Sequence, residues 1–207
     1  MGGENMPKKT GRNTKGKIVS TAWKLFYEQG YDDTTVEDII LESGTSKGSF
    51  YHYFEGKDSL LGSLSILFDE KYEELQEQLP EDLPVMDALL LLNRELFSMI
   101  ENSISLELLA QLLSSQLITK GERHLLNRNR TYFRLLHRLV KKGQERGELL
   151  PRLSANQIVS AYAMLERALL YEWCLNGGSY SLTQQASQIL PVLLKGYILP
   201  PSAPSVP

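Results

Sequence analysis

Apolar residues recur at helical spacing along most of the chain. Ile18, Ala22 and Phe26 fall at i, i+4 and i+8, and they predict a first helix that stops near Gly30. The same spacing predicts further helices over the ranges 34–42, 46–53, 57–79, 85–101, 104–118, 122–146, 154–175 and 182–198. No segment shows the alternation of a strand, and no repeat of about 20–50 residues is present. The pattern therefore predicts an all-α protein of about nine helices.

The second and third of these helices are short and lie close together. Thr34 and Glu37 form a T-x-x-E capping box at the start of the second helix, and Gly44 marks its end. Thr45 or Ser46 then serves as the N-cap of the third. Two short helices joined by a glycine-containing turn are typical of a helix-turn-helix.

The third helix has the composition of a surface that contacts DNA. Its first turn holds small and basic residues: Ser46, Lys47, Gly48 and Ser49. First-turn residues of a recognition helix reach base edges, and a glycine there lets the backbone approach a partner closely. Tyr51 and His52 carry polar tips suited to phosphates or bases, whereas Phe50 and Phe54 can anchor the helix. The alternative is a small surface helix that its aromatic residues merely hold in place.

The last two predicted helices are unusually apolar. Residues 158–173 are interrupted by few polar side chains, and the final helix carries a wide apolar stripe with Pro191 expected to bend it. Such helices could complete an internal core or form half of a four-helix bundle with a second copy. The chain already has six other apolar faces to fill its own core, which favours the second arrangement.

Composition favours a cytoplasmic globular protein of one large or two small domains. Of its 207 residues, 42% are hydrophobic and 23% are charged, and no run of 18 apolar residues predicts a membrane span. The basic start has no apolar core of a secretory signal. Cys174 is the one cysteine, so no internal disulfide or cysteine-based zinc site is expected, and a buried, unreactive thiol is favoured over a redox sensor.

The net charge of −3 is unevenly distributed. Residues 5–27 carry six basic residues and no acid, residues 69–82 seven acids and one lysine, and residues 123–146 eight basic residues and one acid. The basic stripe of the seventh helix comprises Arg130, Arg134, Arg138 and Lys141. It could contact nucleic acid, but a solvated face, paired in part with the acidic fourth helix, is favoured.

Two motifs that could indicate catalysis are incomplete. Residues 11–17, "GRNTKGK", match a phosphate-binding loop, but Ile18 occupies the position of the required Ser or Thr and no strand precedes them. The three histidines are widely separated and no H-E-x-x-H occurs. Neither an enzyme, a metal site nor a cofactor is expected.

Residues 30–61, "GYDDTTVEDIILESGTSKGSFYHYFEGKDSLL", resemble the N-terminal signature of the TetR family of transcriptional regulators. "GQERGEL" at 143–149 and "YEWCLN" at 171–176 extend the resemblance more weakly. The resemblance implies three helices for DNA and about six for ligand binding and dimerisation. The expected domains are a flexible basic arm (1–10), a helix-turn-helix domain (11–56), a ligand-binding and dimerisation domain (57–199) and a disordered tail (200–207).

The resemblance also implies roles for individual residues. Phosphate contacts are expected from Thr35, Tyr51, His52 and Lys57, and major-groove contacts from Ser46, Lys47, Gly48 and Ser49. The basic arm, with Lys8, Lys9, Arg12, Lys15 and Lys17, would add phosphate or minor-groove contacts. A homodimer formed through the last two helices would bind a palindromic operator of double-stranded DNA, because its recognition helices would lie about 34 Å apart.

A small-molecule effector is expected to bind among the fourth to eighth helices and to change the angle of the fourth. The candidate pocket residues are Phe97 and Leu113 as apolar wall, Tyr132 as a polar-tipped aromatic and Glu166 as a charge in an apolar helix. A salt bridge is favoured for Glu166; were it unpaired in the cavity, an amine-bearing ligand would fit. The alternative function is a helical carrier or scaffold, which would not need the basic arm, Lys47 or Tyr51.

Overall fold

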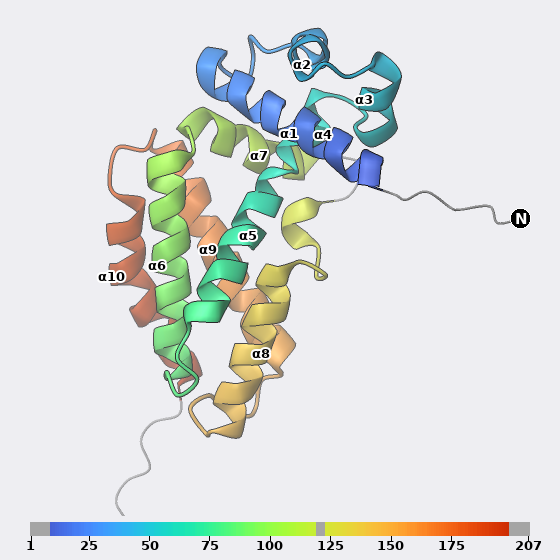
Figure 1. Ribbon diagram of the computed structural model, residues 1–207. Coiled ribbons are helices and arrows are strands. Elements are labelled where there is room, and N and C mark those ends of the chain that lie inside the picture. The colour runs from blue at the N-terminus through green and yellow to red at the C-terminus, as the bar shows by residue number, and fades with distance from the viewer. Residues whose placement is uncertain (1–8, 119–122, 199–207) are drawn as a thin grey trace, which may run out of the picture. The chain divides into compact units, whose positions relative to one another are not determined.

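The computed structural model describes residues 9–118 and 123–198, with side chains from Thr14 onward. Apart from one isolated bridge between Leu149 and Ile198, the regular structure of these residues is helical (Figure 1). The α-helices are α1 (Lys9–Gln29), α2 (Val36–Ser43), α3 (Lys47–Tyr53), α4 (Lys57–Leu61), α5 (Leu64–Gln78), α6 (Val85–Ser103), α7 (Leu106–Ile118), α8 (Thr131–Glu145), α9 (Ala155–Leu175) and α10 (Leu182–Leu194). Two 3-10 turns follow α7 and α10, η1 (His124–Leu126) and η2 (Lys195–Tyr197). The predicted all-α fold is confirmed.

The helix predicted over 57–79 is divided into α4 and α5. At the break, the Ser63 hydroxyl donates to the Leu60 carbonyl and accepts a hydrogen bond from the Trp23 indole at 2.8 Å. A Cβ on Gly62 would lie 2.2 Å from Cδ2 of His124, so a side chain at this position would clash. The helix predicted from residue 122 is also shorter, because α8 begins only at Thr131.

The chain forms two compact units. The first contains the chain up to Ser65 together with Glu107–Leu125, and the second contains Ile66–Leu106 together with the chain from Leu126 onward. Helix α5 begins in the first unit and continues in the second. Residues 1–8 of the expected basic arm and the expected tail, 200–207, lie outside the described residues.

The first unit is built around α1, which packs against α2 and α3. Its core is formed by fully buried apolar side chains, among them Ile18, Ala22, Ile39, Phe50 and Leu60. Phe50 and Phe54 are both buried, which confirms the anchoring role predicted for them. Of the other residues of α3, Lys47, Gly48, Tyr51 and His52 are exposed, and Ser49 and Tyr53 are partly exposed.

The second unit is a helical bundle in which α6 packs against α10 and α8, and α9 packs against α8 and α10. Gly143 on α8 allows one of these contacts, because a Cβ there would lie 2.6 Å from Cγ1 of Val85. Within the described part of the chain, no single helix is long and apolar enough to cross a membrane, and α6 and α7 meet that criterion only as a broken pair.

Candidate DNA-binding surface and ligand-binding site

The start of α2 differs by one residue from the sequence prediction. Thr35, not Thr34, is the N-cap, and it forms a capping box with Asp38: Asp38 N donates to Thr35 Oγ1 at 3.1 Å and Thr35 N donates to Asp38 Oδ2 at 2.9 Å. The hydroxyl and then the backbone N–H of Thr35 hold the pKa of Asp38 below its usual value. Thr34 is buried and donates to the Gly30 carbonyl at 2.7 Å. The exposed Thr35 thus lies at the N-terminus of α2, where helix dipole and free N–H groups favour an anion such as phosphate.

The turn between α2 and α3 is fixed by its backbone. Gly44 adopts φ 63°, the left-handed region that favours glycine, and its N–H bonds to the carbonyls of Ile40 and Leu41. Ser46 then caps α3, accepting from Ser49 N at 3.1 Å. These local bonds set the direction in which α3 leaves the turn.

The first turn of α3 is open to solvent. Ser46, Lys47 and Gly48 are exposed and Ser49 is partly exposed. A Cβ built on Gly48 would meet only Ser46 Oγ, at 4.0 Å, and the residue has no positive φ. Nothing in the described part of the chain therefore requires a glycine at position 48.

Lys47 and Tyr51 lie close together on this face. Lys47 Nζ is 3.5 Å from Glu37 Oε1 and 5.9 Å from the Tyr51 ring centre, and both members of the ion pair are 70% exposed. Exposed pairs of this kind contribute at most about 1 kcal/mol, so the ammonium can exchange its partner for a phosphate or base. His52 is exposed, with its ring against Tyr53.

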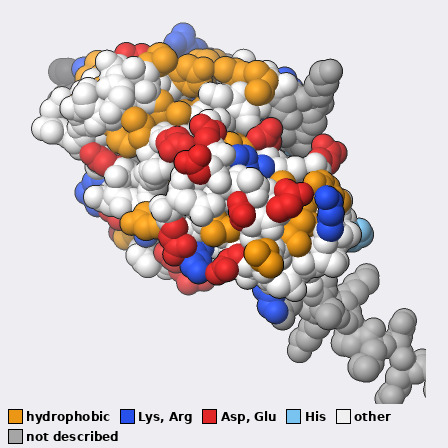
Figure 2. Space-filling model, turned by 90° about the horizontal axis from the view of Figure 1, so that it is seen from above, with side chains coloured by type: hydrophobic (Ala, Val, Ile, Leu, Met, Phe, Trp, Pro, Cys, Tyr) orange, Lys and Arg blue, Asp and Glu red, His pale blue; other side chains and the backbone are white. Residues whose placement is uncertain are grey.

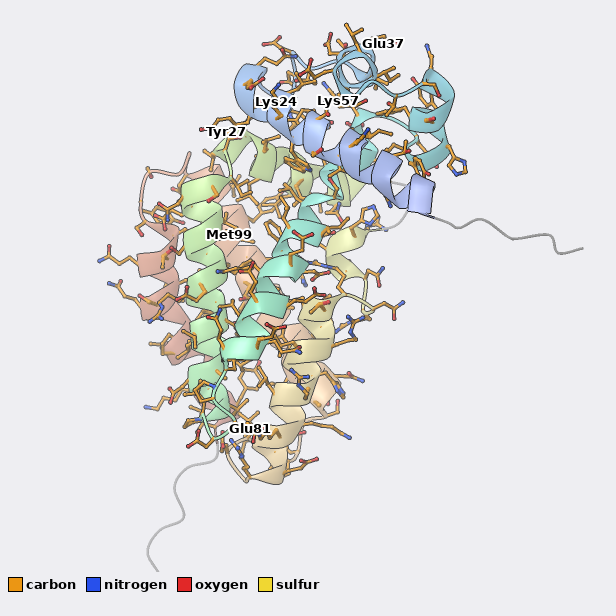
Figure 3. The ribbon with its side chains drawn as sticks, viewed as in Figure 1. Lys24, Tyr27, Glu37, Lys57, Glu81 and Met99 are labelled. Atoms are coloured by element: carbon orange, nitrogen blue, oxygen red, sulfur yellow. The ribbon has the colours of Figure 1, made fainter. Side chains whose placement is uncertain are left out.

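Lys57 is held within the protein. Its ammonium donates to the carbonyls of Tyr31 at 2.7 Å and Asp32 at 3.3 Å and lies 4.3 Å from the Tyr31 ring centre (Figure 3). The Tyr31 hydroxyl donates to Asp58, and burial followed by this bond raises the pKa of Tyr31. Lys57 thus ties the start of α4 to the loop after α1, whatever it adds to phosphate binding.

Lys15 and Lys17 are the described side chains of the predicted basic arm, and both are exposed on α1. Lys8 lies outside the described residues, and for Lys9 and Arg12 only the helical backbone is described. Acidic, basic and hydrophobic side chains are interspersed on the face drawn in Figure 2, so the basic side chains form no continuous patch on that face.

In the second unit, Glu166 of α9 is buried with 4% exposure and both of its carboxylate oxygens accept hydrogen bonds. Asn93 Nδ2 of α6 donates to Oε1 at 2.7 Å, and the Tyr132 hydroxyl of α8 donates to Oε2 at 2.6 Å. Burial raises the pKa of Glu166, and the bonds from Tyr132 and Asn93 act against this shift. Glu166 forms no salt bridge among the described residues, so the salt bridge favoured from the sequence is wrong.

Two further tyrosines complete this cluster. The Tyr72 ring of α5 lies 5.0 Å from the Tyr132 ring, and its buried hydroxyl has no hydrogen-bond partner among the described atoms. The Tyr162 hydroxyl donates to the Leu89 carbonyl at 2.7 Å. Burial raises the pKa of Tyr72, Tyr132 and Tyr162, so all three keep their protons.

The four residues predicted for the ligand site are thus only partly brought together. Tyr132 and Glu166 bond directly, and Phe97 is fully buried on α6 in the same unit, one turn from Asn93. Leu113 is buried on α7, which belongs to the first unit. Sequence analysis missed Asn93, Tyr72 and Tyr162, although an asparagine within "LLLLNRELF" is a visible signal of a buried polar contact.

The helices α9 and α10 carry exposed apolar side chains. Met164, Tyr171 and Leu175 follow one face of α9 with exposures of 59%, 39% and 71%, and Val192 of α10 is 71% exposed. Cys174 lies between Tyr171 and Leu175, is partly buried, and burial raises the pKa of its thiol. An apolar surface of this kind is typical of a protein–protein contact.

No group of three or more His, Cys, Asp or Glu side chains among the residues with described positions could hold a metal ion. The features that are present are a helical unit that exposes the short helix α3 and a helical bundle with a buried polar cluster. Together they define a helix-turn-helix regulator with a separate effector unit.

Comparison with known proteins identifies the family. Residues 18–64 match the model of "Bacterial regulatory proteins, tetR family", and residues 68–196 match that of "YsiA-like protein, C-terminal region". The chain therefore belongs to the TetR family of DNA-binding transcriptional regulators, as the sequence resemblance predicted.

Two of the relatives match along most of their length. The fatty acid metabolism regulator protein of Bacillus subtilis is 24% identical over 87% of this chain and 93% of its own. The transcriptional repressor KstR2 of Rhodococcus jostii is 29% identical over 93% and 94%. An uncharacterised regulator of Lactococcus lactis is 48% identical, but over 22% of this chain and 24% of its own length.

Among solved structures, FadR of Thermus thermophilus in complex with lauroyl-CoA has a TM-score of 0.77 and 22% identity, covering 93% of this chain and 99% of its own. FadR of Bacillus subtilis in complex with stearoyl-CoA has a TM-score of 0.68 and 22% identity, covering 88% and 98%. At these identities the likeness establishes a common fold.

Proposed function

We propose that this protein is a repressor that binds a palindromic operator as a homodimer in the cytoplasm and is released from it by a small molecule. The observation that carries the DNA-binding part is Gly48. A glycine in the first turn of a short helix weakens that helix, and no neighbour in the described chain requires it. Its use is therefore to let the backbone approach an outside partner, flanked by the exposed Lys47 and Tyr51.

In this proposal the residues of the DNA-binding surface divide into two sets. Ser46, Lys47, Gly48 and Ser49 face the major groove, and Thr35, Tyr51 and His52 contact phosphates, with Lys15 and Lys17 adding charge. Lys57 contributes mainly by holding α4 in place, because two backbone carbonyls already bind its ammonium. Phosphate contacts set register, whereas base contacts provide sequence preference.

The effector is proposed to bind beside Glu166 and to be an acyl-CoA thioester. Two relatives of the same fold were crystallised with such molecules, lauroyl-CoA and stearoyl-CoA. An amine ligand fits less well, because Glu166 already accepts two hydrogen bonds and burial raises its pKa, which disfavours its charged form. Tyr72 lies on α5, the helix that begins in the first unit and continues into the second. A ligand that moves Tyr72 would therefore also move α5, which is continuous with the chain of the DNA-binding unit.

The proposed dimer uses the exposed apolar faces of α9 and α10. Burying Met164, Leu175 and Val192 against a second copy would remove apolar surface from water at roughly 25 cal/mol per Å². A twofold pair of this kind presents two recognition helices, and hence selects two half-sites.

The test is selection of binding sites from random DNA duplexes, at low and moderate salt, followed by gel shifts with the selected site. A palindromic site should be enriched, and a Lys47→Ala, Tyr51→Ala double variant should lose it. Adding lauroyl-CoA should then release the DNA. Enrichment of no site, or equal binding by the double variant, would leave the fold in place but refute DNA recognition by α3.

A further inference from the structure

The second unit contains a pocket of about 530 Å³. Its walls come from the segment before α8, from α8 and from the start of α9: Arg128, Phe133, Arg134, His137, Asn156 and Val159. The Phe133 ring lies 4.8 Å from the ring of Tyr132, which bonds to Glu166. Two guanidinium groups, an imidazole and an amide line the pocket with two apolar side chains, and none of its described lining residues is an Asp or Glu. The pocket is therefore polar, basic and partly apolar.

Arg128 is fixed in position by neutral groups. Its guanidinium lies 4.5 Å from the centre of the Phe133 ring, and Nη2 donates to Ser160 Oγ of α9 at 2.8 Å. Neither partner neutralises its charge. A planar cation held in one orientation is prepared to bind an anion, because little side-chain freedom remains to be lost on binding.

Arg167 adds a second charge to the same face. It follows Ser160 by seven residues, or two helical turns, and therefore lies on the same side of α9. It is partly buried, yet it forms no hydrogen bond or ion pair among the described residues. Burial lowers the pKa of Arg167, the neighbouring Tyr132 and Glu166 raise it, and the charge of Arg128 lowers it.

Arg130, two residues after Arg128, does have an acidic partner. Arg130 pairs with Asp69 of α5, with Nε 3.1 Å from Oδ2. Arg134 instead donates to Thr131 Oγ1 at 2.9 Å and to the Asn129 carbonyl, which are both neutral. Within the described residues, α5 thus forms a direct ion pair with Arg130, whereas Arg134 reaches Glu73 of α5 only through the Thr131 hydroxyl.

We propose that Arg128 and Arg167, with Arg134 at the rim, bind phosphate groups of the effector. Guanidinium groups match phosphate oxygens in paired hydrogen bonds, and Arg128 and Arg134 line a pocket that has no Asp or Glu among its described lining residues. Phe133 lines the pocket and packs against Tyr132, so the same molecule can place its phosphates at the arginines and its acyl part toward Tyr132 and Glu166. This assignment rests on the proposed function, since it locates the nucleotide part of an acyl-CoA.

The test is calorimetric titration of the full chain with four probes: lauroyl-CoA, laurate, coenzyme A and inorganic pyrophosphate. The variants are Arg128→Gln and Arg167→Gln. Arg138→Gln is the matched control, because Arg138 is an exposed arginine of α8 outside the pocket. Arg167→Lys keeps the charge but loses the paired geometry, and thermal unfolding establishes that each variant folds.

The expected result is a loss of about tenfold to a hundredfold in affinity for lauroyl-CoA in each Gln variant, as for removal of one charge-assisted contact. Arg138→Gln should bind as the unsubstituted protein does, Arg167→Lys should recover part of the loss, and higher salt should weaken binding. Any binding of laurate should be unaffected by the Gln substitutions, because it lacks phosphates.

Other outcomes separate the two proposals. If lauroyl-CoA binds and releases DNA but both Gln variants bind it normally, the phosphate subsite is refuted and the proposed function stands. If coenzyme A and pyrophosphate bind with the expected arginine dependence while no acyl chain improves binding or releases DNA, the subsite stands and the acyl-CoA effector is refuted. If none of the four probes binds, both assignments fail.

Discussion

Replacing Gly48 by alanine should change stability and DNA affinity in opposite directions. The added Cβ would lie 4.0 Å from Ser46 Oγ, an ordinary van der Waals distance, so the free protein accommodates it. Alanine in place of glycine within a helix stabilises by about 0.5–1 kcal/mol. Because Gly48 is the second residue of a seven-residue helix, we expect the lower end of that range.

On DNA the same methyl group would occupy space that the duplex needs. Overpacking of a closely fitted contact costs about 1–3 kcal/mol, and a loss of 1.4 kcal/mol is about tenfold in affinity. A dimer carries two such sites, so a loss of at least tenfold is expected on a selected operator. Thermal unfolding and gel shifts on the same preparations measure the two effects.

The control is Gly196→Ala, in η2 of the second unit, where a Cβ also meets nothing within 4 Å. It should leave operator binding unchanged. The reasoning about Gly48 would be refuted by a Gly48→Ala protein that binds the operator as tightly as the original. A lower melting temperature in that variant would refute the expectation that alanine stabilises α3.

Three further predictions follow from single contacts. Burial raises the pKa of Glu166 above its ordinary 4.5, so the stability that its proton provides is complete below that pH and is lost as pH rises through the raised pKa. Melting curves recorded from pH 4.5 upward should show the melting temperature of Glu166→Gln rising relative to that of the original protein. A constant difference between the two would contradict this. Val192→Glu should convert the proposed dimer into a folded monomer, measured by sedimentation, and should weaken operator binding. The side chain is 71% exposed, so the substitution leaves the core of the monomer untouched. An unchanged dimer would place the interface elsewhere. Lys57→Ala should lower the free energy of unfolding by about 1–2 kcal/mol in denaturant titrations, since two hydrogen bonds from its ammonium are removed. Reduced DNA binding with unchanged stability would instead show a role limited to phosphate contact.

Local sequence signals predicted most of the fold, and they failed where two local solutions were equivalent. "TTVED" contains two overlapping capping boxes, Thr34 with Glu37 and Thr35 with Asp38. The choice depends on the buried Thr34, whose hydroxyl bonds to the Gly30 carbonyl. Similarly, the break between α4 and α5 depends on a bond from Trp23 to Ser63, 40 residues apart, which no local pattern shows.

The candidate ligand site was harder to predict than the DNA-binding surface. Ser46, Lys47 and Gly48 form one turn of one helix, so their order in the sequence is also their order in space. The polar cluster instead draws residues from four helices, α5, α6, α8 and α9. Tyr132 and Glu166 were recognised as polar residues in helices, the signal of Asn93 was missed, and Leu113 belongs to the other compact unit.

Cys174 gives this chain a chemical reporter that needs no engineering. It is the one cysteine of the sequence, and it lies on α9 between two exposed apolar residues of the proposed subunit interface. Burial raises the pKa of its thiol and so slows alkylation, and mass spectrometry can follow the labelling at mildly alkaline pH. The rate of thiol labelling, measured against protein concentration, would therefore report subunit exchange in the unmodified protein, with or without operator and effector.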